Sequence, residues 1–264
     1  CTHHISLEPY VLGKVVAEAV VLSNYTFDTY KTKDKKKSLE SITLCHDSDD
    51  AKVKQGLHDA EIISSSSNLT RELINTPAAD MTPAILAQKA KDACKKSGVK
   101  CTIFDEKQIK KLNMNALLAV GSGSANPPRF IVMEHKGKKA KETIVLIGKG
   151  VTFDSGGINI KPGSFMKDMK YDMSGSAAVI GTMQAIAQLQ LPLHVVGLVA
   201  TAENMPGNNA YRPGDVIKAL NGKTIEVLHT DAEGRVTLTD SLCYAEKFKP
   251  SVVIDLATLT GAVT

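Results

Sequence analysis

Residues 174–200 read SGSAAVIGTMQAIAQLQLPLHVVGLVA, and this stretch indicates the fold class of the whole chain. Its first part, residues 174–189, begins with small residues and has the length and apolar content of a helix. Its last part, residues 194–200, is a short apolar run that fits a buried strand. Another such run precedes the helix at residues 143–147, so strand, helix and strand follow one another. This order predicts an α/β domain, in which helices pack on the sheet that the strands form.

Helices and strands alternate along the rest of the chain from about residue 82. Thr82 and Pro83 predict the cap and first turn of a helix, and Gly98 predicts its end. A further helix is predicted at residues 236–248. The predicted strands cover residues 99–104, 129–134, 143–147, 194–200, 223–228 and 251–256. We therefore predict an α/β fold with a central, mostly parallel or mixed sheet flanked by helices.

The first 75 residues lack this alternation. Residues 1–50 contain two apolar segments around the basic run KTKDKKK at residues 31–37, which is too little apolar sequence for an independent core. Residues 51–75 carry apolar side chains at helical spacing and predict a connecting helix. The motif NTP at residues 75–77 should end that helix, because proline disfavours a helical conformation in the residue before it.

The composition is that of a globular protein of a reducing compartment. The chain has 264 residues, of which 43% are hydrophobic and 23% charged, and its longest apolar runs fall short of a membrane span. The five cysteines are scattered without a C-x-x-C pair, so neither a disulfide framework nor a structural zinc site is expected. The net charge of +4 is mild and the basic run is typical of a solvated loop, so nucleic-acid binding is not expected as a main role.

Charged residues gather in the segments that follow the predicted strands. One segment reads GKGVTFDSGG at residues 148–157 and continues to residue 175, and another reads HTDAEGR at residues 229–235. Sites in α/β sheets form outside the carboxyl ends of strands, so these segments should meet at one edge of the sheet. Among the charged side chains of these segments, the candidate site residues are Asp154, Asp172, Asp231, Glu233, Lys149, Lys161 and Arg235.

Four carboxylates at one edge of a sheet suggest a metal site. Like charges raise one another's pKa values, so the four groups cannot all ionise near neutral pH unless cations join them. Carboxylate oxygens suit Mn²⁺, Mg²⁺ and Zn²⁺, while the H-E-x-x-H pattern of helical zinc proteases is absent from the sequence. Asp231 and Glu233 are two residues apart, so in an extended segment both side chains would point the same way.

Short motifs follow one another in a set order from about residue 51 onward. They are NTP at 75–77, SANPP at 124–128, KGVTFDSGG at 149–157, Asp172-Met173, TDAEGR at 230–235 and ATLTGA at 257–262. Together they resemble the leucyl aminopeptidase family, the cytosol aminopeptidases that use two metal ions. The TDAEGR hexapeptide is the motif most specific for this family.

The resemblance implies a set of metal ligands. Asp154 and Glu233 correspond to the ligands that bridge two metal ions. Asp231 corresponds to the residue that completes the more loosely held site with its carboxylate and its own carbonyl. Lys149 and Asp172 correspond to the residues that complete the tighter site. A lysine ligand binds as the neutral amine, which a nearby dication favours.

Further residues acquire roles from the same resemblance. Lys161 is implied to keep its charge and to stabilise oxygen anions. Arg235 is implied to hold a bicarbonate ion that acts as general base. Met169, Thr258 and Gly261 are implied to form the pocket for the side chain that is removed.

The activity that the resemblance implies is that of a metalloaminopeptidase. Such a hydrolase removes leucine or other apolar residues from the N-terminus of peptides by means of a metal-bridging hydroxide. The cofactors would be two divalent ions per subunit, Mn²⁺ or Zn²⁺ with Mg²⁺ as a further candidate, and the bound bicarbonate. We also expect peptide substrates, a homohexamer, a cytoplasmic location and no membrane association.

The chain departs from the family pattern at three points. Ser174 and Ser176 stand where glycine and alanine are expected, which is a minor change. His229 precedes the TDAEGR motif where the family usually has asparagine; it could be a partner of the ligands, a weak ligand or a polar filler, and we favour a filler over a ligand. Family members continue beyond residue 264 and carry a complete N-terminal domain, so we expect a fragment. Residues 1–50 would be the C-terminal remnant of a smaller N-terminal α/β domain, residues 51–75 a connecting helix, and residues 76–264 a catalytic domain that is incomplete at its C-terminus.

Three alternatives fit the sequence less well. Asp154-Ser155-Gly156-Gly157 is similar to the nucleophile loop of trypsin-like serine proteases, but that fold is all-β and usually disulfide-bonded. Gly148-Lys149-Gly150 suggests a dinucleotide-binding loop, but the third glycine of that motif is missing. The last alternative is a family member that kept the fold without catalysis, or that binds DNA through the basic run. The complete set of site residues argues against it.

Overall fold

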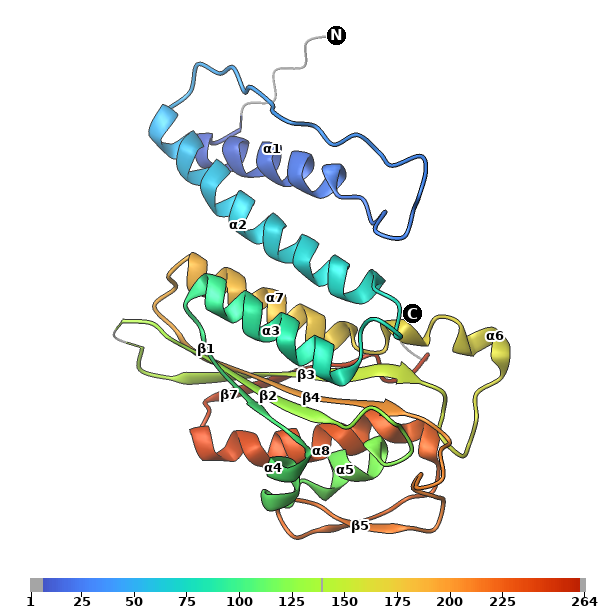
Figure 1. The fold of residues 1–264 in the computed structure, drawn as a ribbon. Helices are drawn as coiled ribbons and strands as arrows, with labels where there is room; N and C mark the ends of the chain where they lie inside the picture. The colour runs from blue at the N-terminus through green and yellow to red at the C-terminus, as the bar shows by residue number, and fades with distance from the viewer. Residues whose placement is uncertain (1–6, 139, 262–264) are drawn as a thin grey trace. The chain divides into compact units, whose positions relative to one another are not determined.

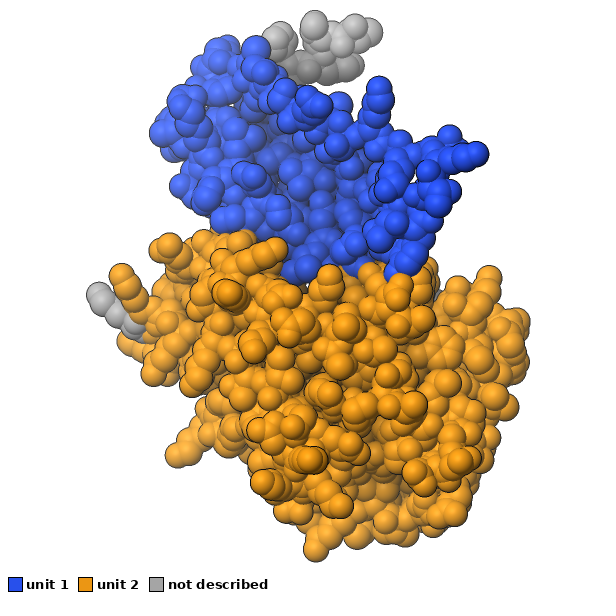
Figure 2. All heavy atoms as spheres, in the orientation of Figure 1, with its two compact units in different colours: residues 1–72 blue, residues 73–264 orange. Residues whose placement is uncertain are grey.

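The computed structural model describes residues 7–138 and 140–261 of the chain (Figure 1). The chain forms two compact units, Cys1–Glu72 and Leu73–Thr264, which have separate colours in Figure 2. Among the described residues, no helix has both the length and the apolar character needed to cross a bilayer.

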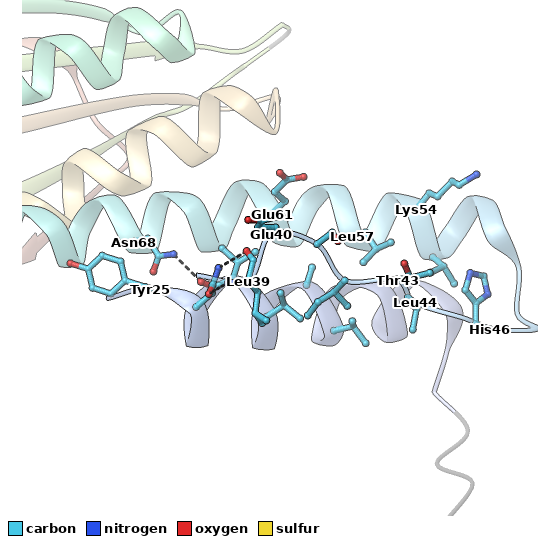
Figure 3. Close-up of a pocket in the computed structure, with 18 of the residues that line it drawn as sticks. Tyr25, Leu39, Glu40, Thr43, Leu44, His46, Lys54, Leu57, Glu61 and Asn68 are labelled. Atoms are coloured by element: carbon cyan, nitrogen blue, oxygen red, sulfur yellow. Dashed lines mark hydrogen bonds between the residues drawn. The ribbon is translucent and has the colours of Figure 1, made fainter. Parts of the chain in front are cut away.

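The first unit is built from helix α1 at Pro9–Asn24 and helix α2 at Asp50–Asn75, whose last residues belong to the second unit. The Arg71 guanidinium of α2 donates to the carbonyl oxygen of Leu22 at the end of α1, at 2.9 Å. Residues 39–46 run beside both helices and help to line a cavity of about 730 Å³ (Figure 3). The Asn24 side chain fixes the start of this segment, because it accepts from the Leu39 amide at 2.9 Å and donates to the Leu39 carbonyl at 3.3 Å.

The second unit contains a five-stranded mixed sheet, which confirms the predicted fold class. The strands lie in the order β1 (Lys100–Phe104), β2 (Arg129–Lys136), β4 (His194–Asn204), β3 (Thr143–Asp154) and β7 (Val252–Leu256). Strand β2 is antiparallel to both of its neighbours, whereas β4, β3 and β7 are parallel to one another. The carboxyl ends of these three strands therefore meet at one edge of the sheet.

Helices cover both faces of the sheet (Figure 1). Helices α3 (Pro83–Ser97) and α7 (Ser174–Gln188) lie on one face, and α4 (Glu106–Lys111), α5 (Asn115–Gly121) and α8 (Glu233–Ala245) lie on the other. Strands β3 and β4 are buried along almost their whole length, because they are sandwiched between the two helix layers. The remaining short elements are α6 (Gly163–Met166), η1 (Met169–Tyr171), β5 (Val216–Lys218), β6 (Thr224–Glu226), η2 (Thr230–Ala232) and η3 (Glu246–Phe248).

Three strands of the central sheet extend further than the sequence pattern predicts, and a fourth predicted strand lies elsewhere. Strand β2 continues by two residues to Lys136. Strand β3 continues to Asp154 and β4 continues to Asn204. Residues that were expected in loops therefore lie at the carboxyl ends of these two strands. The predicted strand at residues 223–228 shortens to β6, which pairs with β5 in a separate two-stranded sheet. The segment after residue 228 therefore does not follow a strand of the central sheet, and it begins helix α8 three residues before the predicted position.

Helix α3 begins and ends as predicted. The Thr82 side chain accepts a hydrogen bond from the Ile85 amide, and Pro83 occupies the first turn. Gly98 ends the helix with the left-handed angles φ 77° and ψ 15°, and its amide donates to the Cys94 carbonyl.

We expect Gly98→Ala to lower the free energy of unfolding by about 1 kcal/mol, because a side chain disfavours the left-handed conformation. Space is not the issue, since a β-carbon at Gly98 would have no heavy atom within 4 Å. Gly163 is a matched control, because it also has nothing within 4 Å and does not adopt a positive φ. Chemical denaturation should therefore show that Gly163→Ala leaves stability unchanged or slightly raised. Equal losses in both variants would contradict this account of the helix end.

Candidate metal centre

The charged residues quoted from the sequence converge on one cavity at the carboxyl edge of the sheet. Lys149 and Asp154 lie on the last part of β3, Asp172 directly follows η1, and Asp231 and Glu233 lie in η2 and at the start of α8. The cavity has a volume of about 640 Å³. Its walls are formed by Lys149, Asp154, Lys161, Asp168, Met169, Tyr171, Asp172, Asp231, Glu233, Ala257, Thr258, Leu259, Thr260 and Gly261.

Lys149 is the centre of one half of the site. Its Nζ atom lies 2.7 Å from Asp172 Oδ1 and 2.8 Å from Glu233 Oε1, and it donates to the Thr258 carbonyl at 2.9 Å. The Thr258 hydroxyl donates to the same Asp172 oxygen at 2.8 Å. This lysine therefore connects β3, the turn after η1, the start of α8 and the segment after β7.

Lys161 is the centre of the other half. Its Nζ atom lies 2.9 Å from Asp154 Oδ2 and 2.5 Å from Asp231 Oδ1. The other oxygen of Asp154 accepts from the Gly156 amide at 2.9 Å. Asp154, Asp231 and Glu233 each offer a carboxylate oxygen within 4.8 Å of the others, so the two halves form one cluster.

Burial sets the electrostatics of the cluster. Removal from water raises the pKa values of Glu233 and Asp172, and the Lys149 ammonium opposes this rise without cancelling it. Burial lowers the pKa of Lys149, but the Asp172 and Glu233 carboxylates raise it by more, so its pKa is raised overall. The pKa of Lys161 is also raised, because Asp231 and Asp154 outweigh the effect of its partial burial.

The donor set fits divalent cations. Four carboxylates face two ammonium groups, so an excess of negative charge remains in a poorly hydrated place. Asp172 Oδ2 is buried and has no hydrogen-bond partner in the part of the chain that the structure describes. A buried carboxylate oxygen without a partner is costly unless a cation or a proton binds it. Carboxylate oxygens with one amine nitrogen are suitable ligands for Mn²⁺, Zn²⁺ or Mg²⁺.

Of the other residues predicted from the sequence, some line the cavity and others lie outside its wall. Met169, Thr258 and Gly261 line the cavity. Arg235 lies on the first turn of α8, where its side chain is exposed and outside the cavity wall. His229 is exposed and precedes η2. Residue 262, the last of the ATLTGA motif, lies outside the described residues.

Asp231 and Glu233 share the site for a different reason from the one expected. In an extended segment the two side chains would point the same way, but Asp231 lies in the 3-10 turn η2 and Glu233 is the first residue of α8. The expectation of an extended segment was therefore wrong. Both side chains reach the cavity because η2 and the first turn of α8 lie at the edge of the sheet.

Asn204 is a site residue that the sequence argument did not name. It is fully buried at the end of β4, and its Nδ2 atom donates to Asp154 Oδ1 at 2.8 Å and to the Thr230 carbonyl at 3.0 Å. The Tyr211 hydroxyl donates to the same carbonyl at 2.7 Å, and burial raises its pKa so that it keeps its proton. The polar pair Glu203-Asn204 after an apolar strand was a signal for this position, because sites form at such strand ends.

Two of the sequence motifs support the site from a distance. Glu203, next to Asn204, accepts from the Ser124 hydroxyl at 2.5 Å and from the Asn126 side-chain Nδ2 at 3.1 Å, which connects the SANPP motif to the end of β4. The Lys170 ammonium of η1 donates to the Asn75 carbonyl of the NTP motif at 2.8 Å. The NTP motif thus contacts η1, which carries cavity residues, and the SANPP motif contacts the strand end that carries Asn204, the donor to Asp154.

The fold and the cluster together define an α/β protein with a carboxylate-rich site suited to divalent cations. Comparison with protein families agrees with this class, because residues 68–264 match the catalytic domain of the cytosol aminopeptidase family. The chain is 50% identical over 252 residues to the probable cytosol aminopeptidase of Aquifex aeolicus and 46% identical over 259 residues to the cytosol aminopeptidase of Pseudomonas aeruginosa PAO1. The chain belongs to the cytosol aminopeptidase family, which confirms the resemblance seen in its motifs.

The chain spans about half the length of these relatives. The matches cover 95% of this chain and 50% of the Aquifex protein, and 97% of this chain and 52% of the Pseudomonas protein. Among solved structures, the bottromycin maturation enzyme BotP in complex with Mn is similar, with a TM-score of 0.86 and 37% identity. That match covers 95% of this chain and 53% of BotP.

We expect Asn204→Ala to lower the free energy of unfolding by about 2–4 kcal/mol, because Asp154 and Thr230 would lose buried donors. Thr201 on the same strand is a matched control. It is fully buried, and its hydroxyl has no hydrogen-bond partner within the described ranges, so Thr201→Val should change stability little or raise it. Denaturant unfolding with a metal chelator present measures both variants. An Asn204→Ala protein as stable as the Thr201→Val protein would contradict the role assigned to this amide.

Proposed function

We propose that this chain provides the catalytic part of a metal-dependent aminopeptidase. The observation that carries the proposal is the convergence of four carboxylates and two lysines on one cavity, in a chain of the cytosol aminopeptidase family. Relatives with this name and the Mn complex of BotP support it. The alternatives of a non-catalytic or DNA-binding family member are not favoured.

Five residues would hold two divalent cations. Asp154 and Glu233 would be shared between the two ions, Lys149 and Asp172 would complete one site, and Asp231 would complete the other. We propose Mn²⁺ or Zn²⁺ as the ions, with Mg²⁺ as a further candidate, because the donors are oxygens and one nitrogen.

The chemistry follows from how the residues surround the cavity. Divalent cations held there would supply Lewis acidity and lower the pKa of a water molecule. Lys161, which faces Asp154 and Asp231, would oppose negative charge that develops on the carbonyl oxygen of a peptide. Met169, Thr258 and Gly261, which line the cavity, would contact the side chain of the residue that is removed. By resemblance to the family, Arg235 would hold bicarbonate as general base, and its exposed side chain would have to turn toward the cavity to do so.

The acidic cluster also suggests why cleavage would start at the N-terminus. The free amine of a peptide has a lone pair that could bind one of the cations held by these carboxylates, whereas the lone pair of an internal amide nitrogen is delocalised into its carbonyl and binds cations poorly. We propose leucine or other apolar residues as preferred N-terminal residues, since Met169 and Leu259 give the cavity apolar walls. By resemblance to the family, we also propose a homohexamer in the cytoplasm.

Asp231→Ala should remove one metal ion per chain and lower the rate of leucine amide hydrolysis at least tenfold. The measurement is metal content after dialysis, taken beside activity, on the protein at its full natural length. Glu226→Ala is the control, because Glu226 is an exposed carboxylate outside the cavity and its loss should leave metal content unchanged. A wild-type protein that holds no more metal than Asp231→Ala and cleaves nothing would refute the proposed function.

Lys161→Met should separate catalysis from metal binding. Methionine has a similar length without the charge, so kcat should fall by about 10²- to 10³-fold while metal content stays within about twofold of wild type. Steady-state kinetics and metal analysis on the same samples test this. Parallel loss of metal and activity would mean that Lys161 organises the ligands and does not act on the substrate.

A further inference from the structure

His229 makes a specific contact with the segment that carries Asp231. Its backbone is extended, with φ −151° and ψ 123°, and it occupies the position before the turn η2. The His229 Nδ1 atom accepts a hydrogen bond from the Asp231 amide at 3.2 Å, and the His229 carbonyl accepts from the Ala232 amide at 3.2 Å. The side chain and the backbone carbonyl of His229 thus accept hydrogen bonds from two successive amides of η2, those of Asp231 and Ala232.

Asp231 is the carboxylate whose position depends most on this turn. Its side chain is 28% exposed, whereas the side chains of Asp154, Asp172 and Glu233 are 3%, 6% and 2% exposed. Close packing fixes the three buried carboxylates. Packing fixes Asp231 less, so the conformation of η2 has a larger share in directing its carboxylate toward Lys161 and the cavity.

We infer that His229 is a positioning residue that holds the η2 turn so that the Asp231 carboxylate faces the cation site. The inference rests on the proposed function, because it concerns affinity for the cation that Asp231 would help to bind. The Nδ1 lone pair is already engaged with the Asp231 amide, so this nitrogen acts through the turn and not as a metal ligand. The ring then carries its proton on Nε2, the tautomer that accepts at Nδ1.

The contact predicts which substitutions are tolerated. Asparagine can accept from the amide two residues later, as in the turns that Asn and Asp side chains form with their own backbone. Alanine and valine have no acceptor. Valine is favourable in extended backbone, so His229→Val removes the hydrogen bond without disturbing the conformation at the position itself.

The test compares Mn²⁺ binding by wild type, His229→Asn, His229→Ala and His229→Val, at full natural length and one fixed pH near 7.5. Isothermal titration calorimetry resolves the tighter and the weaker binding step. We expect alanine and valine to weaken the weaker step by about threefold to tenfold, as expected for one hydrogen bond, and asparagine to stay within about twofold. The tighter step should not change, because Lys149 and Asp172 lie elsewhere in the cavity.

Two controls separate positioning from other effects. Thermal unfolding in a chelator should give matching midpoints for the four proteins, because His229 is exposed. His58→Ala removes an exposed histidine of α2 that lies outside the cavity, and it should leave both binding steps unchanged, which accounts for adventitious binding by imidazole.

Three outcomes would overturn the inference. Equal weakening in all three variants, asparagine included, would identify the imidazole as a direct ligand. Unchanged binding in the alanine and valine variants would show that the contact has no influence on Asp231. If wild type binds no Mn²⁺ beyond the Asp231→Ala level, the proposed function fails and the role of His229 fails with it.

Discussion

The crowding of negative charge at the carboxyl edge of the sheet is the constraint that organises the second unit. Asp154, Asp172 and Glu233 are almost completely removed from water, where isolated carboxylates are very unfavourable. Lys149 and Lys161 each pair with two carboxylates from different segments. The charge pairs therefore hold together three segments that are distant in the sequence: the end of β3, the turn after η1, and the adjoining η2 and start of α8.

This arrangement requires space as well as charge, and two glycines provide it around Lys149. A β-carbon at Gly234 would lie 2.7 Å from Lys149 Cε and 2.9 Å from Lys149 Nζ. A β-carbon at Gly175 would collide with the carbonyl oxygen of Leu256 and lie 3.1 Å from the Lys149 amide. Small residues thus occur where α7 and α8 approach β3 and β7. The density of glycines in the sequence reflects the close approach of backbone to a buried charged side chain.

Sequence patterns predicted the fold well because buried strands and helices have strong apolar signals. The apolar pattern missed the end of β3, where glycines and charged residues stand in place of apolar ones. The strand continues through Gly148, Lys149 and Gly150 to Asp154, although this composition is typical of a loop. Motifs predicted which charged residues gather, but not how Asp231 and Glu233 reach the cavity, since a turn and a helix start leave no periodic pattern. Asn204 was not predicted because the role of a single side-chain amide depends on the groups it contacts in the folded chain, which the sequence does not show.

The two lysine-centred halves of the cluster differ in their contact with solvent, and this difference bears on how such a site would work. Lys149 is 3% exposed and has buried partners on both sides, so its half is held rigidly by packing. Lys161 is 15% exposed, and its partner Asp231 is 28% exposed, so the other half faces the open cavity. A substrate entering from solvent would meet the Lys161 half first. The Lys149 half would then keep its geometry, and so would Asp154, whose side chain is only 3% exposed. Lys161 and Asp231 could adjust to what binds, because they are packed less closely.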